Sequence, residues 1–265
     1  MTNEYCPITG NVMTHAFSET LLNKYKVNYF YCEESGFLKA EKPYWLEEAY
    51  QDAIANTDTG LVARNLKNSE WLEPILHNLF DANSKFVDVS GGYGLLTRCL
   101  RDRGFDCFSI DVYCQNLFAS AFEPPEGISA NCLFAFEVLE HIENPYDFLV
   151  ENFSKYSCNS ILFSTLTFDG ELPNKDWWYY SFETGQHISF FQPKTLKLMG
   201  EKLGVYYYNL SPELHFYSKD KLTPLSLALI KNKRLRKFYA AHVRKKRKKL
   251  GKTWDDHLLM KQKLK

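Results

Sequence analysis

Residues 85–94 read KFVDVSGGYG, an apolar run that leads directly into a glycine-rich turn. The following residues, LLTRCLRDRG, place apolar side chains at helical spacing. A strand that passes through glycines into a helix exposes backbone N–H groups and the positive end of the helix dipole. The stretch predicts either a tight strand-to-helix turn alone or a place where the backbone closely approaches a ligand.

The next predicted strand, residues 105–111, favours a ligand-binding turn over a tight turn alone. It ends at Asp111, 19 residues beyond Gly92, where a carboxylate can accept hydrogen bonds from both ribose hydroxyls. The dinucleotide fingerprint G-x-G-x-x-G is incomplete, because Thr97 stands at its last position. The pattern therefore indicates a nucleoside cofactor and argues against a dinucleotide.

Strands and helices alternate on either side of this turn, which predicts an α/β fold with a mostly parallel sheet and helices on both faces. Two helices are expected before residue 81, a short helix after Asp111, and a helix from about Pro193. Late β-like runs, VYYYNL and LHFYS, add an antiparallel strand. The expected divisions are a small hairpin module at 1–42, a cofactor-binding domain at 43–218, and a basic helical tail at 219–265.

The turn and the acid together resemble class I S-adenosylmethionine-dependent methyltransferases. Residues 88–94 are similar to their D-x-G-x-G-x-G motif, Asp111 to their ribose-binding acid, and FEVLEH at 136–141 to a segment that follows their fourth strand. Two departures stand out: Ser90 replaces the first glycine, and the stretch from Asp111 to Asn131 is short for a helix and a full third strand. The resemblance implies a Rossmann-like methyltransferase whose cofactor is S-adenosylmethionine.

The resemblance also implies which residues bind the cofactor. Arg64, in a D-T-G-x-x-x-R-N segment, is a candidate partner of the cofactor carboxylate, although a solvated arginine beside a helix N-cap is the alternative. The whole implied set is Asp88, Gly91, Gly92, Gly94, Asp111, Phe136, Glu137 and Arg64.

The N-terminal module is similar to the zinc-ribbon hairpin of a methyltransferase subgroup that includes sugar C-methyltransferases. Where that subgroup has two C-x-x-C pairs, this chain has Cys6-Pro7-Ile8-Thr9 and Cys32-Glu33-Glu34-Ser35. Two thiols and two hydroxyls are a poor zinc set, so we expect a module without bound metal.

Residues 177–191, WWYYSFETGQHISFF, are the candidate acceptor region, since sugars and planar molecules stack on aromatic rings. A packed satellite core is the alternative. QHISFF is similar to the E-H-x-S-Y-F segment of the sugar methyltransferases, which implies His187 as general base, with Gln186 in place of the preceding acid. His141 is the second catalytic candidate.

Composition bounds the remaining possibilities. A chain of 265 residues, 45% hydrophobic and 24% charged, excludes a disordered protein. Seven cysteines without a C-x-x-C pair, and no apolar segment long enough to span a bilayer, favour a soluble cytoplasmic protein. Residues 219–265 hold 17 Lys or Arg and 3 acidic residues, against 15 and 29 before them.

Residues 231–249 predict a basic amphipathic helix with 11 Lys or Arg and no acid. This helix can pack on the acidic remainder of the chain, contact a membrane surface peripherally, or bind nucleic acid. The sequence contains no RNA-binding motif that would support the last of these. We therefore expect a methyltransferase that acts on a small molecule or a saccharide, nucleotide-linked and lipid-linked sugars included. An RNA methyltransferase steered by the tail and an inactive cofactor-binding scaffold are the alternatives.

Overall fold

Two units make up the chain, and each is assembled from separate stretches of sequence. The first contains residues 1–56, 136–154 and 162–219, and the second contains 57–135, 155–161 and 220–265. The computed structural model describes residues 4–50, 58–247 and 251–263. The predicted divisions at 42/43 and 218/219 stay predictions. The contacts themselves group the basic tail with the glycine-rich turn.

The second unit is built around β4 (Lys85–Val89), which lies between two parallel neighbours in the order β5-β4-β6. These neighbours are β5 (Asp106–Ile110) and β6 (Cys132–Ala135). Val87 lies opposite Phe108 on one side and Leu133 on the other. Four of the five residues of β4 are buried, as expected of a strand covered on both faces.

Helices of the second unit pack next to this sheet. α2 (Leu61–Leu79) contacts α3 (Leu95–Asp102), and α3 contacts β5. The predicted short helix after Asp111 is wrong. Every residue from Asp111 to Asn131 is described, and none lies in a helix or a strand. The short sequence between the two strands leaves no room for the extra elements, so β5 is an edge strand of this unit.

The basic tail packs on its own unit. It forms α6 (Pro224–Lys231), α7 (Lys233–Arg247) and α8 (Thr253–Lys263). In α7 the Tyr239 hydroxyl donates to the His77 carbonyl at 3.3 Å, and the Arg236 guanidinium lies 4.7 Å from the centre of the Trp71 ring. In α8 the buried Asp256 carboxylate accepts hydrogen bonds from Arg101. Packing against the chain itself thus accounts for one face of the tail.

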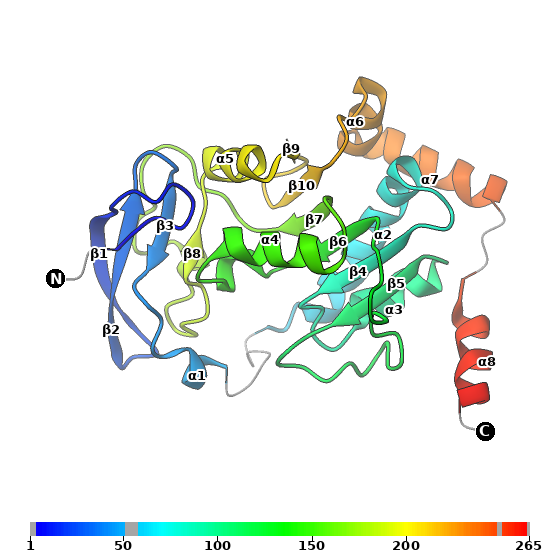
Figure 1. Ribbon diagram of the computed structural model, residues 1–265, viewed down its shortest axis with the longest axis horizontal. Coiled ribbons are helices and arrows are strands. Elements are labelled where there is room, and N and C mark those ends of the chain that lie inside the picture. The colour runs from blue at the N-terminus through cyan, green and yellow to red at the C-terminus, as the bar shows by residue number, and fades with distance from the viewer. Residues whose placement is uncertain (1–3, 51–57, 248–250, 264–265) are drawn as a thin grey trace. The chain divides into compact units, whose positions relative to one another are not determined.

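In the first unit, four antiparallel strands follow the order β1-β2-β3-β8, with blue strands beside a yellow one in Figure 1. They are β1 (Thr14–Leu21), β2 (Tyr25–Cys32), β3 (Phe37–Ala40) and β8 (Ser189–Phe190). Leu38 lies opposite Phe190, and the Ala40 amide donates to the Ile188 carbonyl at 2.9 Å. The N-terminal module is therefore paired with the segment that carries His187.

The rest of the first unit is a second group of strands and helices. Its strands neighbour one another in the order β7-β10-β9, and β10 and β9 are antiparallel. The elements are α1 (Leu46–Ala49), η1 (Leu139–His141), α4 (Pro145–Lys155), β7 (Ile161–Ser164), η2 (Trp178–Tyr180), α5 (Pro193–Leu203), β9 (Tyr206–Asn209) and β10 (Leu214–Ser218). The helix expected from Pro43 includes described residues only at Leu46–Ala49, because 51–57 lie outside them.

The predicted fold class is confirmed: the protein is α/β, with parallel strands, flanking helices and a late antiparallel strand. Among the described residues, no helix has the length and apolar character needed to cross a membrane.

Candidate functional site

The glycine-rich turn leaves β4 through left-handed backbone. Ser90 has φ +61°, and Gly94, at φ +79°, is the N-cap residue of α3. A Cβ atom on Gly91 would collide with the Ser109 hydroxyl and would lie 2.7 Å from Asp88 Oδ2. Gly91 is therefore required for space, and glycine suits position 94 because of its backbone angle.

Asp111 is held in place by the backbone of the same unit. Its Oδ2 accepts the Gly92 amide at 2.9 Å, and its Oδ1 accepts the amides of Tyr113 and Cys114 at 2.7 and 2.9 Å. Because an ionised carboxylate offers about four lone-pair sites, Oδ2 keeps one for a ribose hydroxyl. A Cβ on Gly92 would meet no atom within 4 Å, so the space over this backbone is open. These observations fit the nucleoside of S-adenosylmethionine.

Asp88 lies beneath the turn and is 2% exposed. Burial raises the pKa of its carboxyl to about 8, with a smaller contribution from the negative charge of Asp111. A neutral Asp88 avoids placing a buried charge beside the half-buried Asp111. Its part in the turn is therefore to fill space under Gly91, where its carboxyl leaves no room for a side chain.

Arg64 forms an ion pair with Asp58, with nitrogen to oxygen distances of 3.1 and 2.7 Å. The helix α2 begins after Gly60, whose N-cap position makes no side-chain hydrogen bond. The structure therefore places the Arg64 guanidinium on Asp58, and its contact with a cofactor carboxylate stays a prediction.

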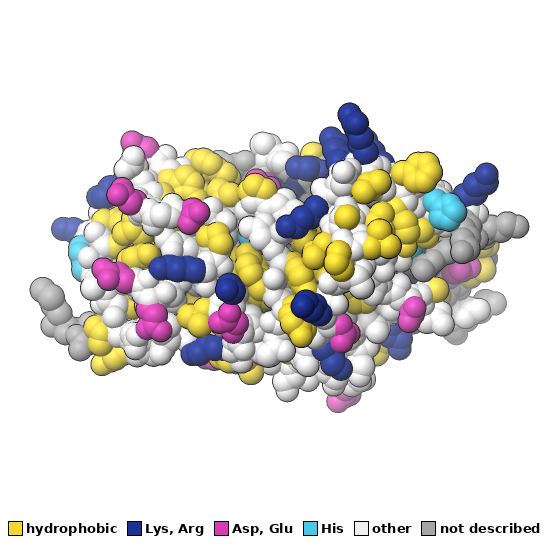
Figure 2. All heavy atoms as spheres, turned by 90° about the horizontal axis from the view of Figure 1, so that it is seen from above, with side chains coloured by type: hydrophobic (Ala, Val, Ile, Leu, Met, Phe, Trp, Pro, Cys, Tyr) yellow, Lys and Arg dark blue, Asp and Glu magenta, His cyan; other side chains and the backbone are white. Residues whose placement is uncertain are grey.

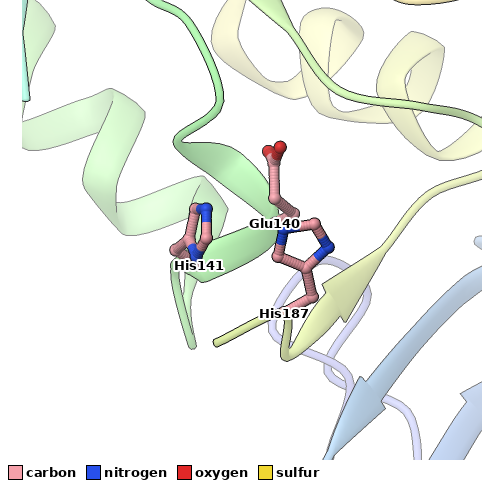
Figure 3. A group of neighbouring side chains, drawn as sticks. All are labelled: Glu140, His141 and His187. Atoms are coloured by element: carbon pink, nitrogen blue, oxygen red, sulfur yellow. The ribbon is translucent and has the colours of Figure 1, made fainter. Parts of the chain in front are cut away.

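The two candidate histidines lie together in the first unit, as Figure 3 shows, with ring centres 4.8 Å apart and planes at 82°. His187 Nδ1 lies 2.6 Å from the Tyr179 carbonyl oxygen, and His141 Nδ1 lies 3.1 Å from the Gln186 carbonyl oxygen. A carbonyl can only accept, so both rings carry their proton on Nδ1. Each Nε2 therefore presents a lone pair.

Both imidazoles are held in the neutral form. Burial lowers the pKa of His187, and the Tyr179 carbonyl opposes this effect. Burial also lowers the pKa of His141 to about 3, with a further contribution from His187. At neutral pH both rings are unprotonated on Nε2. A carbonyl raises the pKa of each ring, but the charges of Glu137 and Glu183 also raise that of His187, whereas His187 lowers that of His141. His187 is therefore the better of the two proton acceptors.

Glu140 is a third member of this cluster, and sequence reasoning missed it. It is fully buried, its Oε1 accepts the Tyr179 hydroxyl at 2.8 Å, and its Oε2 has no partner among the described residues. Burial raises its pKa to about 8, with a smaller contribution from Glu137. Tyr179 thus joins Glu140, through its hydroxyl, to His187, through its carbonyl. The signal was available: Glu140 is the acid next to His141 in FEVLEH.

The ligand atoms of Glu140, His141 and His187 lie within 4.8 Å of one another. Around a tetrahedral zinc ion with bonds of about 2.0–2.1 Å, ligand atoms are roughly 3.3 Å apart. Atoms as far apart as 4.8 Å would have to approach one another to enclose such an ion. We therefore treat these residues as acid–base groups.

Glu137 and Phe136 follow β6 directly and are half-buried. Glu137 has φ +56°, its amide donates to the Ser164 hydroxyl at 2.8 Å, and that hydroxyl donates back to its carboxylate. A non-glycine residue held in left-handed backbone next to a strand end is typical of functional sites. Contact of these two residues with the cofactor stays a prediction.

The aromatic segment 177–191 is largely core. Tyr179, Tyr180 and Phe190 are buried in a cluster with Tyr29 and others of the N-terminal strands. The alternative of a packed satellite core therefore holds for most of these rings. Trp178 differs, because 71% of it is exposed beside Tyr179, at a ring-centre distance of 5.4 Å.

The four positions of the ribbon-like pairs do come together. Cys6 Sγ lies 3.3 Å from the Ser35 hydroxyl, and Cys32 Sγ lies 3.5 Å from the Thr9 hydroxyl. Each thiol is thus hydrogen-bonded to the hydroxyl of the opposite turn. These bonds supply a direct link between the two turns.

Comparison with known proteins identifies the family. The sequence model of a protein family, described as a methyltransferase domain, matches residues 62–209, more than half of the chain. The protein therefore belongs to this family, and it is a class I methyltransferase domain whose cofactor is S-adenosylmethionine. The residues that the sequence assigned to the cofactor, from Arg64 to Glu137, lie within the matched range.

The solved structures to which this chain is similar have low sequence identity to it. TnmH is 16% identical, with 68% of this chain and 62% of that chain covered at a TM-score of 0.42. CalO1, a methyltransferase in calicheamicin biosynthesis in its SAH-bound form, is 14% identical, with 66% and 61% covered at 0.41. Magnesium protoporphyrin IX methyltransferase of Synechocystis PCC 6803 with bound SAH is 11% identical, with 65% and 90% covered at 0.44.

The chain spans about three fifths of the length of the first two of these proteins. A comparison with curated protein sequences found no match.

Proposed function

We propose that this protein transfers a methyl group from S-adenosylmethionine to a small molecule or saccharide, with His187 as general base. The observation that carries the proposal is the state of His187: its Nδ1–H donates to the Tyr179 carbonyl, and its lowered pKa leaves Nε2 unprotonated at neutral pH. A base of this kind accelerates a proton transfer about 10²–10⁴-fold.

S-Adenosylmethionine, when bound, supplies a methyl group on a positively charged sulfur, so the protein need not activate the leaving group. In the proposal, the amides of the glycine-rich turn and the Asp111 carboxylate hold the cofactor. His187 Nε2 accepts the proton that the acceptor atom loses as it takes the methyl group, and Tyr179 keeps the imidazole in the required tautomer. His141 is the second candidate for the proton acceptor, but its pKa of about 3 makes it the weaker base.

A saccharide or planar acceptor is supported by Trp178, which exposes 71% of its surface next to Tyr179, the partner of His187. Indole rings stack on the apolar faces of sugars and on planar molecules. Kinship with the sugar C-methyltransferase subgroup rests on the ribbon-like turns and on QHISFF. It remains part of this proposal.

Calorimetric titration with S-adenosylmethionine and with S-adenosylhomocysteine tests the cofactor half. We expect dissociation constants of micromolar order. D111A should raise them at least tenfold, since a hydrogen bond to a charged group contributes about 1.5–3 kcal/mol. Unchanged binding by D111A would remove Asp111 from the site.

Release of S-adenosylhomocysteine over a panel of acceptors that begins with nucleotide sugars tests the catalytic half. H187Q should lower kcat at least 100-fold with unchanged cofactor binding. H15Q is a matched control, because His15 is an exposed histidine of the same unit. A fully active H187Q variant would exclude the base. Cofactor binding without turnover on any acceptor would favour the scaffold alternative.

A further inference from the structure

The segment that ends in α7 carries charge of one sign. From Lys221 to Arg247 the sequence contains no aspartate or glutamate. The predicted basic stretch 231–249 falls within α6, α7 and the residues after them, and its last two lysines lie outside the described residues. The proposed methyl transfer gives this charge no role.

One face of α7 is used by the fold. Ala240 and Val243 are buried, and Arg236 and Tyr239 contact Trp71 and His77 of α2. These α7 residues are spaced at three and four positions, so they form one stripe of the helix. The opposite stripe is free of this packing.

The opposite stripe mixes cations with an exposed aromatic ring. Arg234, Phe238 and Lys245 are spaced by four and seven residues, and all three are exposed. Phe238 is 78% exposed and Leu235, at its edge, 45%. Leu225 of the neighbouring α6 is 70% exposed. Figure 2 shows dark blue and yellow side chains next to one another on the face over α6 and α7. We call the residues Leu225, Arg234, Leu235, Lys237, Phe238 and Lys245 the basic face.

We propose that the basic face binds the surface of a membrane that contains anionic lipids. Lysine and arginine are attracted by anionic headgroups, and each such residue near the surface strengthens binding about fivefold. Exposed Phe238, Leu225 and Leu235 can enter the boundary between headgroups and acyl chains, where apolar side chains are stabilised. The basic face therefore contains both the cations and the apolar side chains that such binding uses.

Nucleic acid is the competing partner, and the apolar side chains argue against it. Non-specific binding of single strands uses aromatic rings on which successive bases stack. Phe238 is the one aromatic residue of the basic face, and its apolar neighbours Leu225 and Leu235 are aliphatic. Aliphatic side chains have no such role on a phosphate backbone but lower the free energy of membrane-bound protein.

Co-sedimentation of the full-length protein with vesicles tests the proposal. One set contains phosphatidylcholine alone, and the other contains phosphatidylcholine with about one third phosphatidylserine. We expect binding to the second set only, and release when salt is raised to about 0.5 M, because salt screens these charges. Equal binding to both sets, or to neither, would overturn the proposal.

Two variants locate the surface. R234E/K245E should weaken vesicle binding at least 25-fold, at about fivefold for each charge. F238S should weaken it severalfold and leave its salt dependence in place. K42E/K197E changes the net charge equally with exposed lysines of the first unit and should bind like the unchanged protein. Equal losses in both charge-reversal variants would mean that the basic face has no special role.

A 20-nucleotide single-stranded RNA serves as the competing probe. The proposal expects the protein to bind it more weakly than it binds the anionic vesicles. Tighter binding of the RNA, lost in R234E/K245E, would identify the basic face as a nucleic-acid surface and overturn the lipid assignment. Thermal unfolding checks that each variant folds, and F238S, at a 78% exposed position, gives an independent test if a charge reversal does not.

Discussion

The glycine-rich turn takes its shape from seven consecutive residues, Asp88 to Gly94, whereas the histidine cluster joins two residues 46 positions apart, His141 and His187. In the turn, backbone amides and left-handed backbone angles determine the geometry. In the cluster, side chains are set by hydrogen bonds to carbonyls from other segments. Damage to the turn should therefore affect the cofactor, and damage to the cluster should affect turnover.

The largest expected effect on cofactor binding is that of G91A. Its new methyl group would collide with the Ser109 hydroxyl and crowd Asp88, so the turn must shift. We expect the dissociation constant for S-adenosylhomocysteine to rise at least 30-fold, about 2 kcal/mol. G127A is the control, because Gly127 has open space around it, so a methyl group there meets no neighbouring atom; unlike Gly91, Gly127 also has left-handed backbone, at φ +70°. Calorimetry that finds G91A and G127A alike would contradict the close contact.

The next effect is that of Y179F on the cluster. Removal of the hydroxyl leaves Glu140 Oε1 without its donor and takes an acceptor from the Leu166 amide. A buried polar group that loses its partner costs about 1–3 kcal/mol, so the free energy of unfolding should fall by that amount. The carbonyl that holds His187 stays, so cofactor binding should be unchanged. Denaturant unfolding with parallel calorimetry checks both; a stability equal to that of the parent protein would exclude the network.

Both regions contain a buried carboxyl with a pKa of about 8, Asp88 in the turn and Glu140 in the cluster. In each case the folded pKa exceeds the unfolded value of about 4. The stability from the neutral form is complete below pH 4 and is lost as pH rises toward 8. Between pH 5 and 8 the free energy of unfolding should therefore fall less in E140Q than in the parent protein. The two decreases should differ by at least about 1.4 kcal/mol, the equivalent of one pKa unit.

Unfolding free energies at pH 5 and pH 8 measure this difference. E183Q is the control, since Glu183 is exposed in the same segment. D88N should behave like E140Q, although its region is the turn. A parallel pH dependence in E140Q and the parent protein would show that Glu140 ionises as readily in the fold as outside it.

The smallest expected effect is that of S90G, which is stabilising. Ser90 holds φ +61°, where a side chain costs about 1 kcal/mol and glycine costs little. The melting temperature should rise by about 2–4 °C, and cofactor binding should be kept. A lower melting temperature would mean that the serine hydroxyl makes a contact worth more than the backbone strain.

Much of the turn could be read from the sequence, because its signals are local. The glycines, the apolar strand before them and the acid at Asp111 all lie within 27 residues, from Lys85 to Asp111. The short helix expected after Asp111 failed because 20 residues of mixed composition were assigned an element that this connection does not contain. The resemblance implied a third strand there, and the short length of the stretch argued against it.

The cluster was only partly predictable, because tertiary contacts decide it. His141 and His187 were found from motifs, but the tautomer of each depends on carbonyls that no local pattern places. Glu140 stood in a quoted motif, yet its burial and its bond to Tyr179 follow from packing alone. The aromatic segment was interpreted as an acceptor pocket, and most of it is core. The spacing of aromatic residues in the sequence does not distinguish a pocket from a packed core.

The pairing of β3 with β8 has a consequence for synthesis on the ribosome. Leu38 pairs with Phe190, so about 150 residues must be added before the outer edge of β3 meets its partner. At about 5–20 residues per second this takes roughly 8–30 s. During that interval Phe37 and Leu38, which are fully buried in the finished protein, lie on an unpaired strand edge that another nascent chain can join. The speed of translation and the occupancy of that edge by chaperones therefore govern the yield of folded protein.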